Sequence, residues 1–355
     1  MQDAYNKIKS LLIMLHARGL GRTTALQLIE AYGSAENAVL QGWDPQQRLF
    51  FDKWKVADWE IDWEIAEKEK VTLLTYDQEL YPKNLLKSPG FPLILYVKGT
   101  LLPSDHQSLA LVGTRNATLY GKQAAETLAK EIAPCGITIV SGLARGIDTA
   151  AHEGTLKGSG RTFAVLGSGL STIYPSENRA LSSKIVDSGA LISEFPMKTA
   201  PSPGLFPQRN KTISGLSLGV CLVESPLEGG GMITMRVAEQ QNKTLFALPG
   251  RIDWPTFEGN HLLLKQNKAR LITCSSDLLN FFNRSPMKNL TQHSQPGLTE
   301  EEIALLAKFT QQEKSVEELV LLTQLPIMQL NVLLTRLVLK KVVKEFPGKI
   351  YKKIW

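Results

Sequence analysis

The sequence predicts a doubly wound α/β domain with a mainly parallel sheet over about residues 108–283, and three observations point to it. Short apolar runs that stop at glycine recur here, as in CGITIVSG and RTFAVLGSG. Such runs are typical of buried strands in a parallel sheet. Helix candidates lie between them, at 122–133, 149–157, 178–188 and 232–241. Strand, glycine-rich loop and helix alternate about six times, which is the pattern of a doubly wound fold.

The glycine loops of this region predict a crevice that binds an anion. In a doubly wound sheet the carboxyl ends of the parallel strands share one edge, and ligands bind there. Arg115 follows Gly113 at the end of the first strand. The segment FPQRNK places Arg209, Asn210 and Lys211 at a junction between a loop and a helix. Several cations beside glycine loops favour phosphate binding over isolated surface charges.

A further glycine run, Gly229–Thr234, is expected to open a helix and to present backbone N–H groups to an anion. Arg145 is a further cation available to the crevice. The sequence lacks the GxxxxGK[ST] motif of P-loop nucleotide hydrolases. The run Gly167–Gly169 follows a strand, but Thr172 stands where a dinucleotide-binding fingerprint needs its third glycine.

The composition sets broad limits. A chain of 355 residues is expected to hold two or three domains. The net charge of +6 permits an anionic partner without requiring one. Three cysteines without a CxxC pair predict a reducing, cytoplasmic setting. No apolar run is long enough for a membrane span, and the five histidines show no metal-ligand spacing. We therefore expect no metal, no cofactor and no membrane partner.

Four titratable residues could serve as catalytic groups, but structural roles are favoured for all of them. Asp148 and His152 are one helical turn apart and could form an acid/base pair. The alternative, which we favour, is that Asp148 caps a helix and His152 hydrogen-bonds locally. Glu194 and Glu224 each end a strand, and we expect them to pair with Arg209 or to cap neighbouring loops. The sequence thus predicts no catalytic residue.

The N-terminal flank, residues 1–68, predicts a helical module. Gly19-Leu20-Gly21 precedes an amphipathic stretch, which suits either a phosphate-binding helix-hairpin-helix or an ordinary turn between helices. Four tryptophans lie among acidic residues, so we expect them to pack against the main domain; they are Trp43, Trp54, Trp59 and Trp63. Residues 69–107 are rich in strand-forming residues and are expected to extend the sheet or cover its edge, within a domain spanning 69–283.

The C-terminal flank predicts a linker over 284–297 and a winged helix-turn-helix over 298–355. Two capping boxes, Thr299 with Glu302 and Ser315 with Glu318, open helices. A third amphipathic helix follows, then a hairpin around Pro347-Gly348. The last 20 residues hold seven cations and one acid. Winged helices bind duplex DNA or protein, and both alternatives remain open from the sequence.

Over most of its length the chain closely resembles the bacterial DNA-processing protein A (DprA/Smf) family. The motifs that carry the resemblance occur in order: ALVGTRNAT, GITIVSGLARGIDTAAHEGTL, RTFAVLGSGLSTIYPSEN, GALISEFP, FPQRNKTISGLS, ITMRVAEQQNK and FALPG. The resemblance implies an extended Rossmann-like domain between a small SAM-like N-terminal module and a winged C-terminal module. It also implies a cytoplasmic protein that binds single-stranded DNA, protects incoming DNA in natural transformation, loads the RecA recombinase and forms homodimers.

Matched by motif, the resemblance implies a set of phosphate-binding residues: Gly113, Arg115, Ser141, Gly142, Gly167, Gly169, Arg209, Asn210, Lys211 and Thr234. Some positions depart from the family pattern. Thr114 stands in place of serine, Lys211 in place of arginine, and Gly229 and Gly231 in place of serines. Lysine keeps the charge but not the bidentate geometry of arginine.

Two rival functions remain. The Gly229–Thr234 loop loosely resembles that of nucleoside-monophosphate phosphoribohydrolases, although the sequence lacks the proline, threonine and glutamate of their motif in register. The basic C-terminal module suggests instead a regulator that binds duplex DNA.

Overall fold

The computed structural model describes residues 2–17, 20–41, 57–286, 297–309, 313–340 and 342–353. The chain forms two compact units, Met1–Met287 and Lys288–Trp355. Each unit is described by itself below.

The first unit is built on one sheet, in which the described residues contribute nine strands in the order β1-β2-β6-β5-β4-β3-β7-β8-β9. The strands are β1 (Thr72–Thr75), β2 (Ile94–Gly99), β3 (Ser108–Gly113), β4 (Thr138–Ser141), β5 (Thr162–Val165), β6 (Ala190–Ser193), β7 (Gly219–Glu224), β8 (Thr244–Ala247) and β9 (Arg270–Leu271). All neighbours from β6 to β9 are parallel. The predicted doubly wound, mainly parallel sheet is confirmed.

The lead-in segment extends this sheet, as one of the two sequence alternatives predicted. β1 and β2 form an antiparallel pair, and β2 pairs antiparallel with β6.

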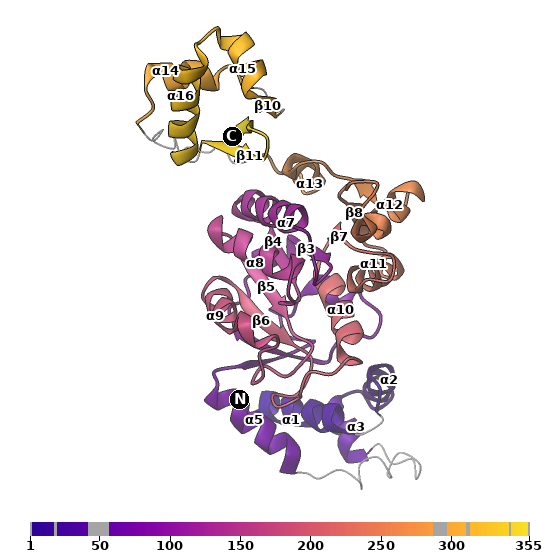
Figure 1. Cartoon of the computed structure of the whole chain (residues 1–355). Helices are drawn as coiled ribbons and strands as arrows, with labels where there is room; N and C mark the ends of the chain where they lie inside the picture. Colours follow the sequence, from indigo (N-terminus) through magenta and orange to yellow (C-terminus); the bar gives the residue numbers. More distant parts are fainter. Residues whose placement is uncertain are drawn as a thin grey trace. The chain divides into compact units, whose positions relative to one another are not determined.

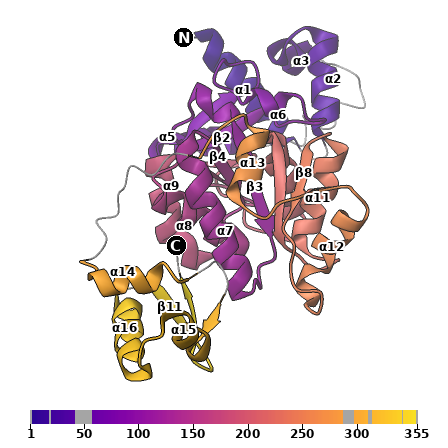
Figure 2. The same ribbon diagram turned by 90° about the horizontal axis from the view of Figure 1, so that it is seen from above.

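Helices cover both faces of the sheet (Figures 1 and 2). Side chains alternate along β3: Leu109 and Leu111 face a core shared with one helical layer, and Ala110 and Val112 face the other. The first layer contains α7 (Leu119–Ile132), α8 (Ile147–Lys157), α9 (Arg179–Ser188) and α13 (Ser275–Phe281). The second contains α6 (Lys83–Leu86), α10 (Leu205–Leu216), α11 (Gly230–Gln240) and α12 (Glu258–Lys265). The four helices predicted between the strands correspond to α7, α8, α9 and α11.

Helix α10 corrects one expectation. Phe206–Lys211 does not form a junction between a loop and a helix, because the whole segment lies inside α10. Pro207 is the third residue of that helix. Proline is tolerated in the first turn because the N–H groups there have no intrahelical acceptor.

The strand order places a topological switch point between β3 and β7. The chain passes from β3 to β4 on one side, and after β6 it returns to β7 on the other side of β3. In open α/β sheets the helices on the two sides diverge at such a point, which leaves a crevice at the carboxyl ends of the strands. Gly113 and Glu224 end the two strands at this position.

The N-terminal helices pack on the β1–β2 side of the same unit; they are α1 (Gln2–His16), α2 (Arg22–Tyr32), α3 (Ala35–Gln41) and α5 (Ala57–Lys68). Trp59 is buried in this core and Trp63 packs against it, as expected for the tryptophans. Trp43 and Trp54 lie outside the described residues. So does Gly19, and the predicted Gly19–Gly21 turn stays a prediction.

The second unit contains α14 (Glu300–Leu306), α15 (Val316–Thr323) and α16 (Ile327–Leu339). A three-stranded sheet joins them, in which β12 (Ile350–Lys353) lies between β10 (Lys314–Ser315) and β11 (Val343–Phe346). Both predicted capping boxes form. Most of the predicted linker lies outside the described residues, and the winged-helix assignment stays a prediction.

Within the described ranges no single helix is long and apolar enough to span a membrane, whereas α15 and α16 together, bent by 112°, pass that test by length and composition alone.

Gly146 allows the loop after β4 to cross the loop after β3. Its φ is 78°, and an added Cβ would lie 2.4 Å from the carbonyl oxygen of Thr114 and 2.6 Å from that of Arg115.

We expect Gly146→Ala to lower the free energy of unfolding by about 2 kcal/mol or more, since both the backbone conformation and the close contact disfavour a side chain. Urea unfolding measures this loss. Gly204→Ala is the matched control, because a Cβ there meets nothing within 4 Å; an equal loss in both variants would contradict the explanation.

Candidate anion-binding site

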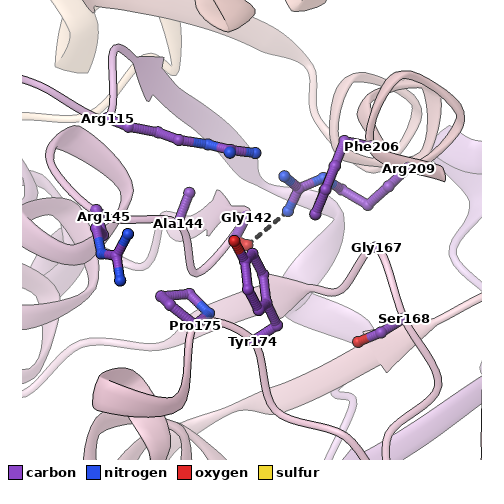
Figure 3. Close-up of a pocket in the computed structure, with 10 residues that line it drawn as sticks. All are labelled: Arg115, Gly142, Ala144, Arg145, Gly167, Ser168, Tyr174, Pro175, Phe206 and Arg209. Carbon is purple, nitrogen blue, oxygen red and sulfur yellow. Dashed lines mark hydrogen bonds between the residues drawn. The ribbon is translucent and has the colours of Figure 1, made fainter. Parts of the chain in front are cut away.

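A basin of about 610 Å³ opens at the switch point. Its walls come from the end of β3 and the loop after it, from the loop before α10 and the first turns of α10, and from the start of α11. A narrower pocket adjoins it and shares Arg115, Phe206 and Arg209 with it (Figure 3). The residues added by this pocket belong to the loops after β4 and β5 and include Gly142 and Gly167.

Arg115 is the cation of this site that is free to meet a ligand. Its side chain is exposed, and its guanidinium carbon lies 4.9 Å from the centroid of the Phe206 ring. Figure 3 shows it extending toward Phe206 and Arg209. Within the described part of the chain no carboxylate pairs with it. An aromatic ring can hold a guanidinium in place without neutralising its charge.

Arg209 is a buried cation at the base of the site. Its Nη1 donates hydrogen bonds to the carbonyl oxygens of Gly142, at 2.5 Å, and Val165, at 2.6 Å. These oxygens lie at the carboxyl ends of β4 and β5. Burial lowers the pKa of Arg209 to about 10, while the charge of Asp148 acts in the opposite direction. The guanidinium therefore stays charged at neutral pH and places a positive charge at the base of the basin.

Asp148 has a structural role, but not the predicted one. Its Oδ2 accepts hydrogen bonds from the backbone nitrogens of Gly142, at 3.1 Å, and Ala144, at 3.3 Å. The helix α8 has Gly146 as its N-cap and no side-chain cap. Asp148 therefore closes the loop after β4 instead of capping α8. Burial raises the pKa of this carboxyl group, against the effect of Arg209.

His152 is a core histidine. Its Nδ1 lies 2.7 Å from the hydroxyl oxygen of Thr162, and that hydroxyl donates to the carbonyl oxygen of Ile139 at 2.8 Å. Because the threonine proton is already used, His152 must donate from Nδ1 and keep Nε2 unprotonated. Nε2 is buried and has no hydrogen-bond partner within the described residues. Asp148 and His152 thus have separate partners and form no acid/base pair.

The other predicted acids are also occupied. Glu194 does not pair with Arg209: it forms an ion pair with Arg22 and accepts hydrogen bonds from α10. Glu224 accepts from the backbone nitrogen of Thr118, so it caps a neighbouring loop, as one alternative predicted. Arg145 lines the narrower pocket, but it forms a bidentate ion pair with Glu177.

The start of α11 contributes backbone to the basin. Gly230, Gly231 and Thr234 line it, and the N-cap Gly229 offers no side-chain cap to the first turn. A Cβ on Gly231 would lie 3.1 Å from the Cα of Gly113. Glycine therefore lets α11 approach β3 closely, with the first backbone N–H groups and the positive dipole end of the helix at the basin.

The structure brings together seven of the ten site residues predicted from sequence. Gly113, Arg115, Arg209, Asn210 and Thr234 line the basin, and Gly142 and Gly167 line the adjoining pocket. Ser141, Gly169 and Lys211 line neither cavity.

These three residues have other surroundings. Ser141 is buried and donates to the carbonyl oxygen of Leu111 at 2.7 Å. Gly169 packs against the backbone of Met197, since an added Cβ would lie 2.1 Å from the carbonyl oxygen of Met197. The side chain of Lys211 is exposed on α10.

The loop Pro201–Pro203 lines the basin but is not among the site residues predicted from the sequence. Its alternating prolines and serine, between a strand and the FPQRNK segment, were the available signal. Tyr174 and Phe206 also contribute, with ring centroids 5.9 Å apart. The described residues contain no cluster of histidine, cysteine or carboxylate groups that could hold a metal ion.

The pH dependence of stability tests the state of His152. Burial lowers its pKa to about 3 in the folded protein, whereas an unfolded histidine titrates near 6.5. The neutral form therefore contributes stability above pH 6.5 that is lost as pH falls toward 3. We expect the wild type to lose roughly 3 kcal/mol more than His152→Gln between pH 7 and pH 4. Denaturant unfolding at each pH measures the difference, and parallel curves would show that His152 is not held neutral.

Comparison with known proteins agrees with this architecture. A family model described as DNA recombination-mediator protein A matches residues 72–283. Protein Smf of Escherichia coli is 43% identical over 208 residues, which are 58% of this chain and 55% of that protein. The match thus spans little more than half the length of that relative.

Two solved structures are also similar. DNA processing protein A from Streptococcus pneumoniae has a TM-score of 0.67 and 29% identity, covering 78% of this chain and 96% of that one. A structure of DNA processing protein A from Helicobacter pylori, described for its single-stranded DNA binding mode, has a TM-score of 0.55 and 31% identity. It covers 60% of this chain and 96% of that one.

Proposed function

Because the chain belongs to the DNA recombination-mediator protein A family, we propose that it binds single-stranded DNA through the sugar-phosphate backbone. The observation that carries the proposal is the convergence at one basin of three groups: an exposed arginine with no carboxylate partner among the described residues, a buried charged arginine, and a helix N-terminus. These three groups all attract an anion. The similar Helicobacter protein, whose single-stranded DNA binding is described, supports the same ligand.

The lining favours phosphate over base recognition. Apart from Arg115 and Arg209, the basin is lined by glycine backbone, prolines, short polar side chains, a few aliphatic and aromatic side chains, and the buried carboxylate of Asp148. A polynucleotide held in this way would be bound with little sequence preference, since phosphate contacts carry no sequence information. Phe206 and Tyr174 lie beside Arg115 and offer faces on which a base can stack.

The proposal includes two activities beyond DNA binding, and a homodimeric state. The protein would protect incoming single strands during natural transformation, load a RecA recombinase onto them and act as a homodimer. The family description as a recombination mediator supports the recombinase step. Light scattering measures the oligomeric state, and strand-exchange assays on covered single strands measure loading.

The two rival functions predict different substrates. A phosphoribohydrolase needs a carboxylate at the nucleotide, but Glu224 is buried and holds Thr118. Free base released from nucleoside monophosphates would favour that rival. A duplex-DNA regulator would bind double-stranded DNA at least as tightly as single-stranded DNA in a competition titration with the full chain.

Arg115→Ala tests the binding site. We expect it to weaken the binding of an oligo(dT) strand by about tenfold or more, because it removes a charge-assisted contact to phosphate. Fluorescence anisotropy measures the dissociation constant. Lys157→Ala, at the far end of α8, is the control for general charge loss, and Lys211→Ala should have a smaller effect than Arg115→Ala because Lys211 lies outside both cavities. Equal binding by wild type and Arg115→Ala would refute this site.

The salt dependence of binding tests the mechanism. Each phosphate neutralised on a single strand contributes a slope of about −0.7 in log affinity against log salt concentration. We expect Arg115→Ala to reduce the slope by about that amount. Affinity that does not change with salt would contradict a phosphate-binding mechanism.

A further inference from the structure

Two carboxylates join the N-terminal helices to the segment between β6 and α10. One belongs to this segment and the other to a helix. Arg22, the first residue of α2, forms an ion pair with Glu194, whose side chain is fully buried. Asp62 on α5 is 5% exposed and accepts a hydrogen bond from the backbone nitrogen of Met197 at 2.6 Å. Glu194 and Met197 lie directly after β6, in the stretch that leads to the basin. The N-terminal helices therefore fix the position of this stretch.

Glu194 extends the contact to α10. Its Oε2 accepts a hydrogen bond from Nε2 of Gln208 at 3.2 Å, and its Oε1 accepts one from the hydroxyl of Thr212 at 3.0 Å. Phe206 and Arg209 belong to the same turns of α10 and line the basin. Because neighbouring turns of a helix move together, a shift of Gln208 and Thr212 displaces the groups that bind the anion.

We propose that Arg22 is a positioning residue for the anion-binding basin: it fixes the Glu194 carboxylate, and Glu194 fixes the first turns of α10. The inference rests on the proposed function, because its effect is read in the binding of single-stranded DNA. It gives the N-terminal helices a role at the site without requiring that they touch DNA. Arg22 lines neither the basin nor the adjoining pocket.

The energetics of burial explain why Arg22 matters. A carboxylate without exposed surface is stable only when it is paired and hydrogen-bonded, and removing its cation leaves an uncompensated buried charge. Burial also lowers the pKa of Arg22, to about 10, so the guanidinium remains charged at neutral pH. Without it, Glu194 would turn toward water and release Gln208 and Thr212. The neutral amide of Glu194→Gln carries no charge that must be compensated.

The experiment compares Arg22→Met, Glu194→Gln and the double variant in the full chain. We expect Arg22→Met to bind oligo(dT) about tenfold more weakly than the wild type, with an unchanged salt slope because no phosphate contact is lost. The double variant should bind no more weakly than Arg22→Met, since the two residues act as one pair. Hydrogen exchange should become faster at the backbone amides of residues 208–212 in Arg22→Met.

Arg161→Met is the matched control. Arg161 forms a comparably buried ion pair with Asp105, whose side chain is 7% exposed, at the amino end of β5. It should lower stability while leaving the dissociation constant within about twofold of the wild type. Equal weakening by Arg161→Met would reduce the effect to general destabilisation and overturn the inference.

Two further outcomes separate the inference from the proposed function. Arg22→Met with wild-type affinity and unchanged exchange in α10 overturns the positioning role and leaves the proposed function intact. A wild-type protein that does not bind single-stranded DNA overturns the proposed function, and hydrogen exchange in α10 then decides whether Arg22 positions that helix.

Discussion

The site depends on one buried guanidinium. Arg209 joins the ends of β4 and β5 by donating to the carbonyl oxygens of Gly142 and Val165. Gly142 must be glycine for this contact, since a Cβ there would lie 2.0 Å from Nη1 of Arg209. A buried cation is costly unless its donors are satisfied, and strand ends supply free carbonyl groups. The two strand ends therefore hold the Arg209 guanidinium in a fixed position at the base of the crevice.

The charged residues around the crevice differ in whether their charge is already used. Arg22 and Arg145 are paired with Glu194 and Glu177. Arg115 has an aromatic ring beneath it and no carboxylate within the described residues. Pairing neutralises a charge locally, so position near the basin is not a sufficient criterion for a ligand contact. Arg145 thus joins two loops through Glu177, whereas the charge of Arg115 is not used in this way within the described residues.

The sequence predicted the sheet well because the signals for its strands are local. The strands from β3 to β8 are short and mainly apolar runs, and a glycine ends or follows several of them, as Gly113 does in β3 and Gly142 does after β4. The two-residue edge strand β9 has no such signal. The start of helix α10 was predicted too late in the chain because Pro207 and the polar residues after it suggest a loop, although proline is acceptable in a first turn. The cavity lining supports the predicted placement of Arg115 and Arg209, since both followed from the rule that loops at one sheet edge converge.

The parts that the sequence did not predict depend on contacts between distant segments. Nothing near Glu194 in the chain indicates that its cation is Arg22. A pairing with Arg209 was expected because both residues were predicted at the same crevice. The fold decides otherwise, because Arg209 points to the carbonyl groups of the strand ends, whereas Glu194 is bonded both to Arg22 of α2 and to Thr212 of α10. A buried carboxylate requires a cation, and the N-terminal helices supply it. The same requirement links α2, through Glu194, to the helix α10 that lines the basin.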